Sequence, residues 1–261
     1  TQVTIAGGYL NVASGTNSTI TGGTENYTNA RHSVVAGHKN VIVSPTDECC
    51  SRGATISGGI GHNSSGGTVD ATTGDITGAI TCCNAGCFIT IGGGCRNIST
   101  GIGSTVSGGM GNCSSANQTV VAGGGTNRAT GNWASILGGS NSQASNSFAT
   151  IGGGYGQTAS GGYSTIVGGN ANTSSGETSF VGGGRNNTAA GPCSAIVGGQ
   201  NNCTTSWYNF VGGGYGNCAS NSRSSVVGGR ENTASGLYSA IGGGHGNRAA
   251  ADGASVTGGG E

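Results

Sequence analysis

IGGGYGQTASGGYST, at residues 151–165, is followed without a break by IVGGNANTSSGETSF, at residues 166–180. Each segment has 15 residues, begins with isoleucine and has glycine two and three residues later. An Ile or Val recurs at this spacing from Ile91 to Val256, and upstream at Ile5, Ile20, Val35, Ile56 and Ile76. The two longer upstream steps predict inserts near residues 41–55 and 61–75. The resulting seventeen repeats predict a solenoid, in which each repeat is one coil stacked on the next.

Positions in the repeat are counted from its Ile or Val, which is position 0. The residue type at each recurring position has a physical reason. A β-branched residue among Ser and Thr favours a short strand with one buried side chain. Glycine occupies position +2 in all seventeen repeats and +3 in fifteen, with His38 and Ala79 as exceptions, which indicates a tight corner. Asn at +6 predicts a second corner, because Asn tolerates the left-handed region. The small residue at +8 fits a thin interior, so we expect an all-β, parallel β-solenoid over 1–261.

The outer side of the predicted strand is almost free of charge. Positions −1 and +1 point away from position 0, and only Asp75 is charged among these thirty-four residues. Bulky apolar residues at these positions include Val120, Leu137, Val167, Phe180, Val197, Phe210 and Val227. The bulky side chain stands at position −1 in one repeat and at position +1 in the next. This alternation leaves open whether one coil has 15 or 30 residues. We interpret this face as the interface of a homotrimer.

The composition excludes several classes of protein. The chain has 59 Gly but only two Pro, so it is not collagen, and its β-branched residues argue against disorder. Its net charge of zero, without a basic stripe, predicts no nucleic-acid partner. No apolar run is long enough to predict a direct membrane span, and no signal peptide opens the chain at Thr1.

Catalytic residues do not come together along the repeat. Glu177 and Asp252 share position +11 but lie five coils apart, and the four His residues occupy different positions. Catalysis on a solenoid needs such groups on neighbouring coils, so we expect no enzyme and no cofactor. The alternative is an ice- or polysaccharide-binding β-solenoid. Thr19-Ile20-Thr21 fits a threonine ladder, but the later repeats replace Thr at these positions.

The ten cysteines are Cys49, Cys50, Cys82, Cys83, Cys87, Cys95, Cys113, Cys193, Cys203 and Cys218. Cys203 and Cys218 share position +7 on consecutive coils, about 5 Å apart, which allows a disulfide. The cluster from Cys82 to Cys95 has no common zinc-ligand spacing and no neighbouring His, so no metal site is predicted.

The run ASGGYSTIVGGNANTSSG, at residues 159–176, resembles the head repeat of trimeric autotransporter adhesins. The matching residues are Ser164, Thr165, Ile166, Val167 and Gly168, then, after the extra Gly169, Asn172, Ser174 and Gly176. The resemblance covers essentially the whole chain and implies a left-handed parallel β-roll, three chains per rod, and an adhesive or spacer role at a surface. The fifteenth residue and the cysteines depart from that family. Gly-rich, Cys-containing repeats are also similar to fibre proteins of phages and large DNA viruses.

We therefore expect a structural or adhesive fibre segment that is extracellular or on a virion surface. Its partners would be itself, as a homotrimer, and a host-surface glycan or protein receptor, or capsid or tail proteins. The unusual number of thiols favours a virion protein assembled in a reducing cytoplasm. The two inserts predict a lateral recognition knob that carries Asp47, Glu48, Cys49, Cys50, Arg52 and Asp70.

Overall fold

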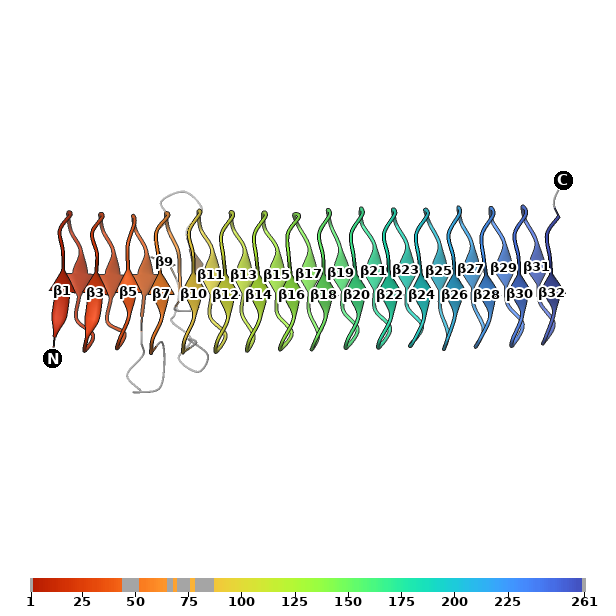
Figure 1. The fold of residues 1–261 in the computed structure, drawn as a ribbon, viewed down its shortest axis with the longest axis horizontal. Coiled ribbons are helices and arrows are strands. Elements are labelled where there is room, and N and C mark those ends of the chain that lie inside the picture. The colour runs from red at the N-terminus through yellow and green to blue at the C-terminus, as the bar shows by residue number, and fades with distance from the viewer. Residues whose placement is uncertain (1, 44–51, 65–67, 70–75, 78–86, 260–261) are drawn as a thin grey trace. The chain divides into compact units, whose positions relative to one another are not determined.

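The computed structural model describes residues 2–43, 52–64, 68–69, 76–77 and 87–259 (Figure 1). Within these residues the regular structure is entirely β, without a helix. The chain divides into two compact units, Thr1–Gly138 and Gly139–Glu261. Both units are parallel β-solenoids, in which almost every coil contributes one strand to a main sheet and one to a second sheet.

The first unit contains eight main-sheet strands. They are β1 (Val3–Ile5), β3 (Ser18–Ile20), β5 (Val34–Val35), β7 (Thr55–Ile56), β10 (Thr90–Ile91), β12 (Thr105–Val106), β14 (Val120–Val121) and β16 (Ser135–Ile136). The second side is formed by β2 (Val12–Ala13), β4 (Tyr27–Thr28) and β6 (Val41–Ile42), and by β11 (Ile98–Ser99), β13 (Cys113–Ser114) and β15 (Arg128–Ala129). An antiparallel pair, β8 (Thr68–Val69) and β9 (Ile76–Thr77), lies outside these sheets.

The second unit repeats the pattern without interruption. Its main sheet contains β18 (Thr150–Ile151), β20 (Thr165–Ile166), β22 (Phe180–Val181), β24 (Ala195–Ile196), β26 (Phe210–Val211), β28 (Ser225–Val226), β30 (Ala240–Ile241) and β32 (Ser255–Val256). Its second sheet contains β17 (Gln143–Ala144), β19 (Thr158–Ala159), β21 (Thr173–Ser174), β23 (Thr188–Ala189), β25 (Cys203–Thr204), β27 (Cys218–Ala219), β29 (Thr233–Ala234) and β31 (Arg248–Ala249). Phe180 pairs with Ala195, fifteen residues on, so the coil has 15 residues and not 30.

The interior of each coil holds one aliphatic side chain and several small ones. In the second unit, Ile166 and Ile196 at position 0 and Ala189 at +8 are fully buried. Buried hydroxyls fill the rest, as where Ser174 and Ser179 share a hydrogen bond of 2.7 Å. The thin interior predicted from the small residue at +8 is confirmed.

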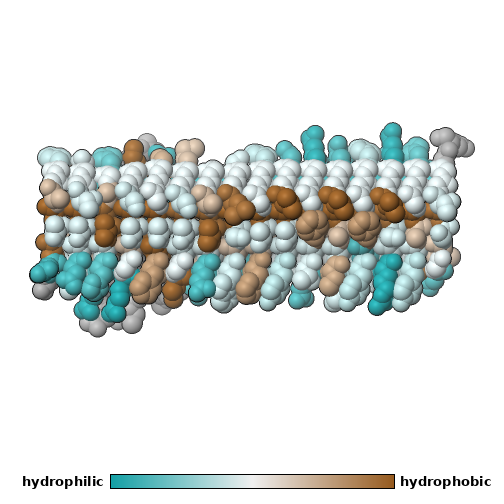
Figure 2. Space-filling model, viewed as in Figure 1, coloured by the Kyte–Doolittle hydropathy of each residue, from teal (hydrophilic) through white to brown (hydrophobic). Residues whose placement is uncertain are grey.

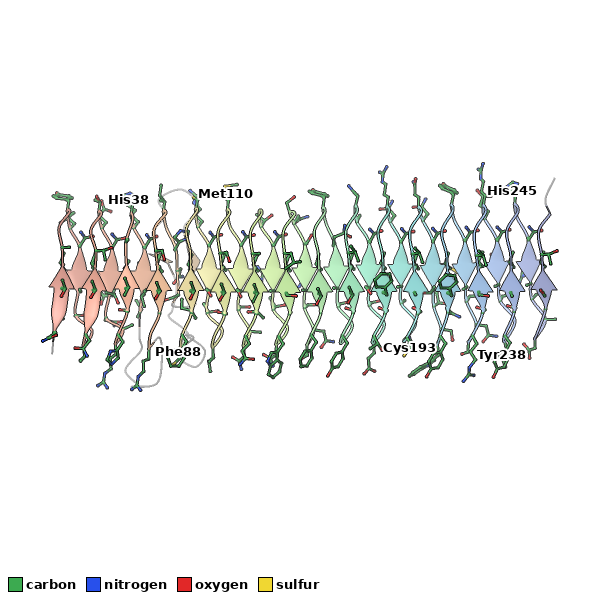
Figure 3. All side chains as sticks on the ribbon, in the orientation of Figure 1. His38, Phe88, Met110, Cys193, Tyr238 and His245 are labelled. Carbon is green, nitrogen blue, oxygen red and sulfur yellow. A yellow bond between two sulfur atoms is a disulfide. The ribbon has the colours of Figure 1, made fainter. Side chains whose placement is uncertain are left out.

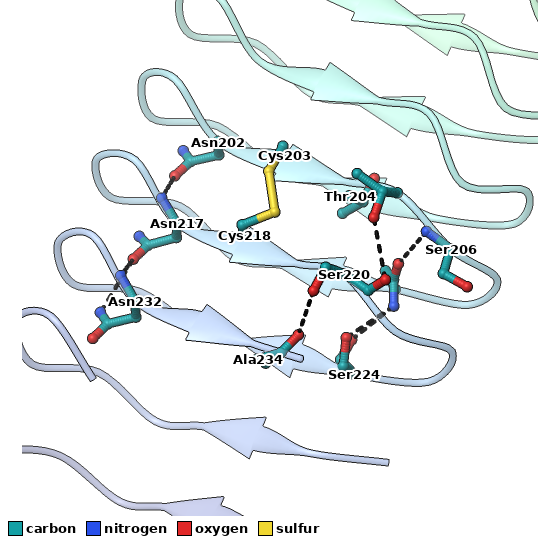
Figure 4. Close-up of a disulfide and its surroundings, with 12 residues drawn as sticks. Asn202, Cys203, Thr204, Ser206, Asn217, Cys218, Ser220, Ser224, Asn232 and Ala234 are labelled. Carbon is teal, nitrogen blue, oxygen red and sulfur yellow. Dashed lines mark hydrogen bonds between the residues drawn. A yellow bond between two sulfur atoms is a disulfide. The ribbon is translucent and has the colours of Figure 1, made fainter. Parts of the chain in front are cut away.

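The asparagines at +6 have a different role from the one predicted. Asn217 is buried, and its Nδ2 donates to the carbonyls of Gly213 and Gly229, at 2.8 Å each. Its Oδ1 accepts the backbone N–H of Asn232 on the next coil at 3.0 Å (Figure 4). The left-handed residue is the preceding one, such as Gly216 with φ of 67°. The Asn side chains therefore form a ladder of hydrogen bonds in the interior, and the left-handed corner is made by the residue before each Asn.

The structure accounts for two irregularities of the repeat, one at Ile76 and one at His38. Strand β7 pairs directly with β10, so Ile76 lies in the antiparallel pair and not in the stack. Among the described residues the main sheet has sixteen strands, one fewer than the seventeen repeats predicted. His38 pairs with Thr24 at position +4, because its coil is one residue shorter and Gly37 takes the +3 place.

Candidate functional site

The outer face of the main sheet carries a stripe of apolar side chains (Figure 2). In the second unit, Phe180 and Phe210 at position −1 are 37% and 39% exposed, and Val167, Val197 and Val227 at position +1 are more than half exposed. In the first unit Leu137 is exposed and Val120 is half-buried. We call these seven residues the apolar stripe. They are the residues that the sequence predicted for a trimer interface, and no charged residue interrupts positions −1 and +1 in the described coils.

The change of bulk from side to side has a local cause. The Phe180 ring lies over Gly182, where an added Cβ would be 3.4 Å from Phe180 Cε1. Phe210 covers Gly212 in the same way, at 3.5 Å. Each of these rings thus fills the space that the glycine of its own coil leaves, so that the five coils from Ile166 to Val226 each present one bulky apolar group.

The glycines at +2 and +3 differ sharply in their surroundings. A Cβ on Gly229, at +3, would lie 2.2 Å from the Gly244 carbonyl oxygen, and its φ is +89°. A Cβ on Gly228, at +2, would meet nothing within 4 Å, and Gly168 and Gly198 are equally open. Packing within the chain therefore explains glycine at +3 but not at +2, although +2 is glycine in nearly every described coil.

The predicted recognition knob falls largely outside the described residues. Asp47, Glu48, Cys49, Cys50 and Asp70 all lie there. Arg52 is described, and its backbone carbonyl accepts the N–H of Phe88 at 2.8 Å. The first insert lies between β6 and β7. The second lies between Ser64 and Cys87 and includes Ile76.

Two of the six cysteines that the structure describes form a disulfide. Cys203 and Cys218 form a disulfide between neighbouring coils on the outer side of the second sheet, with their Cα atoms 4.7 Å apart (Figure 4). Cys87, Cys95 and Cys113 are half-buried thiols and Cys193 is an exposed one, while burial raises the pKa of Cys113. Across the described ranges, no three His, Cys, Asp or Glu side chains gather where they could hold a metal ion.

One titratable side chain is buried in the interior ladder. His62 occupies the place of Asn in its coil, and its Nδ1 accepts the backbone N–H of Asn97 at 3.1 Å. Its Nε2 is buried without a hydrogen-bond partner. Burial lowers the pKa of His62 to about 4, against weaker opposing effects of nearby backbone carbonyls.

This pKa makes the stability of the first coils depend on pH. An unfolded histidine titrates near pH 6.5, so between pH 6.5 and 4 the unfolded chain binds a proton that the native chain does not. Stability is therefore complete above pH 6.5 and falls as pH decreases towards 4, by up to about 3 kcal/mol. We expect His62→Asn to remove this dependence and to supply the missing amide donor. The free energy of unfolding, measured with denaturant at pH 7 and pH 5, tests this. The exposed His32→Asn is the control. If His62→Asn loses as much stability between pH 7 and pH 5 as the unmodified chain does, the prediction is wrong.

A row of exposed aromatic side chains, which the repeat pattern did not predict, lies at one corner of the coils. They occupy position +12: Phe88, Trp133, Phe148, Tyr163, Tyr208 and Tyr238. All have positive φ, between 57° and 60°. Phe148 and Tyr163 stack with centroids 4.7 Å apart. Aligning the repeats at +12 would have revealed the row, but its residue types vary and alternate with Gly, Thr and Arg.

No protein-family model matches this sequence, and no curated protein is significantly similar to it. The part of the chain that the structure describes contains no helix able to cross a membrane.

Proposed function

We propose that this chain is a non-enzymatic segment of a homotrimeric surface fibre, with the apolar stripes of three copies packed around a common axis. The observation that carries the proposal is the stripe itself. Contiguous exposed apolar surface is uncommon on monomeric proteins and marks interaction sites. A closed three-fold arrangement would hide the stripe on every copy.

The energetics of a single coil support an additional buried surface. Fifteen residues lose their conformational freedom, while the interior of each coil in the second unit gains one aliphatic side chain and a few small groups. The open glycines at +2, beside the stripe, also fit a close approach by another copy, because a side chain there would keep a neighbouring backbone away.

Regular coils suit a spacer, and binding groups on such a scaffold could attach it to a receptor or to capsid or tail proteins. We place the fibre outside the cell or on a virion surface. The disulfide between Cys203 and Cys218, which are both half-buried, fits an oxidising environment of this kind.

The trimer can be tested on the unmodified chain. Sedimentation velocity at micromolar concentration should give three times the chain mass of 24.9 kDa. Immunogold electron microscopy of the source cells or particles should place the chain on their surface. A well-folded monomer by sedimentation would contradict the assembly, and label confined to the cell interior would contradict the surface role.

A further inference from the structure

Four exposed side chains form a compact cluster at the +11 and +12 corner of the second unit. Trp207, Tyr208 and Tyr238 are 50%, 52% and 56% exposed, and Arg223 lies between the two tyrosines. We call these four residues the aromatic–arginine cluster. Figure 3 shows Tyr238 at the edge of the coils opposite His245, so the cluster is separate from the +4 corner.

The backbone at this corner does not favour such residues. Tyr208, Arg223 and Tyr238 have φ of 57°, 58° and 57°, a left-handed conformation that bulky residues rarely adopt. Other coils place Asn17 or Gly253 at the same position, which suits that conformation. Because the three large side chains remain exposed, their burial does not explain them. The conformation itself belongs to the coil, since Gln118, Thr178 and Cys193 share it at this position, so the choice of large exposed side chains here is what calls for a function.

Arg223 is held in one orientation by its neighbours. Its guanidinium carbon lies 5.4 Å from the Tyr208 ring centroid and 5.3 Å from that of Tyr238. One terminal nitrogen also donates a hydrogen bond to the Tyr238 hydroxyl at 3.2 Å. No ion pair joins Arg223 to a carboxylate among the described residues. The guanidinium lies between the two rings, and its remaining N–H groups keep the planar fork that can bind a carboxylate with two hydrogen bonds.

Trp207 adds an apolar surface beside this donor. Its ring centroid lies 6.0 Å from that of Tyr208, with an angle of 43° between the planes, so it is not stacked within the column. Trp, Tyr and Arg dominate binding energy at interfaces, and rigid aromatic side chains lose little entropy on binding. The cluster thus combines one oxyanion donor with one exposed ring face.

These features select a ligand with a single negative charge on an otherwise uncharged ring. A strongly acidic peptide would need several cations, but the cluster has only Arg223. One coil beyond Leu237, the Asp252 carboxylate accepts the Leu237 backbone N–H at 2.9 Å and adds negative charge nearby. We propose that the aromatic–arginine cluster binds a carboxylated sugar of an acidic glycan, with the carboxylate on Arg223 and the sugar ring against Trp207. This site specifies the ligand of the proposed attachment role, but it does not depend on the trimer.

Trp207 can report binding directly. The chain has two tryptophans, so the Trp133→Phe chain leaves Trp207 as the sole tryptophan, which can be excited selectively over the tyrosines. We expect methyl glucuronide to change its fluorescence at a concentration at least about tenfold lower than methyl glucoside, which differs only in lacking the carboxylate. Arg223→Lys keeps the charge but loses the planar pair of donors, and should weaken glucuronide binding about tenfold. Arg185→Lys, an exposed arginine at position +4, is the matched control and should leave binding unchanged.

Three results would overturn the site: equal binding of both sugars, no response to glucuronide, or equal binding of N-acetylaspartate amide, which would indicate an acidic peptide ligand. Sedimentation of the same samples separates this proposal from the fibre. A trimer that does not bind glucuronide removes the sugar site alone. A monomer that binds it removes the trimer alone.

Discussion

Replacing Phe180 and Phe210 together with aspartate is expected to convert the trimer into monomers at micromolar concentration. Both rings lie on the apolar stripe, so each assembled trimer would bring six carboxylates towards its axis. Burying unpaired charges costs several kcal/mol each. The concentration for half-assembly should therefore rise about a thousandfold or more. Sedimentation equilibrium measures this, and partial reassembly below about pH 3 is expected because aspartate, with an ordinary pKa of about 3.9, is then largely protonated.

The matched control is Tyr155→Asp with Tyr215→Asp. These tyrosines are also exposed aromatic residues of the second unit, and they add the same number of charges. They lie at position +4 on a corner, away from the main-sheet strands. We expect this variant to remain trimeric. Equal dissociation of both variants would show that net charge, and not the stripe, governs assembly.

Much of the fold follows from the sequence because each coil is held by contacts that repeat. Ile166 at position 0 and Ala159 at +8 are buried as the spacing predicted, and Thr165 pairs with Phe180 in the expected register. Because position 0 is buried in the coils, it holds only Ile or Val, and the 15-residue period can be recognised in the sequence. The outer face was predictable in the same way, because the aligned repeats show directly that positions −1 and +1 lack charged residues.

The remaining features depend on geometry that residue types do not specify. The step from Ile56 to Ile91 contains a false repeat at Ile76, because IxG alone does not distinguish a stacked strand from a strand of an antiparallel pair. The role of Asn217 was misassigned because a left-handed corner and an interior ladder both favour Asn. The aromatic–arginine cluster was missed because exposed positions vary freely between coils, and only the structure shows Arg223 between two rings.

Two adjacent glycines offer a second large effect with an internal control. In Gly229→Ala, the new Cβ would lie 2.2 Å from the Gly244 carbonyl oxygen and 2.6 Å from Asn232 Nδ2. The backbone would also keep a φ of +89°, which alanine rarely adopts. We expect a loss of stability on the order of 3 kcal/mol. Denaturant unfolding measures the loss, and hydrogen exchange should show faster exchange in the coils on either side.

Gly228→Ala should leave the coil intact, because its Cβ enters open space and its φ is outside the left-handed region. Reducing the freedom of the unfolded chain can even stabilise the coil slightly. If another copy packs against the +2 glycines, however, the added methyl group should weaken the trimer about tenfold or more. The two variants thus separate coil stability from assembly at neighbouring residues. A Gly228→Ala chain that assembles like the unmodified protein would show that the +2 glycines do not lie in the interface, and the apolar stripe would then have to account for assembly without them.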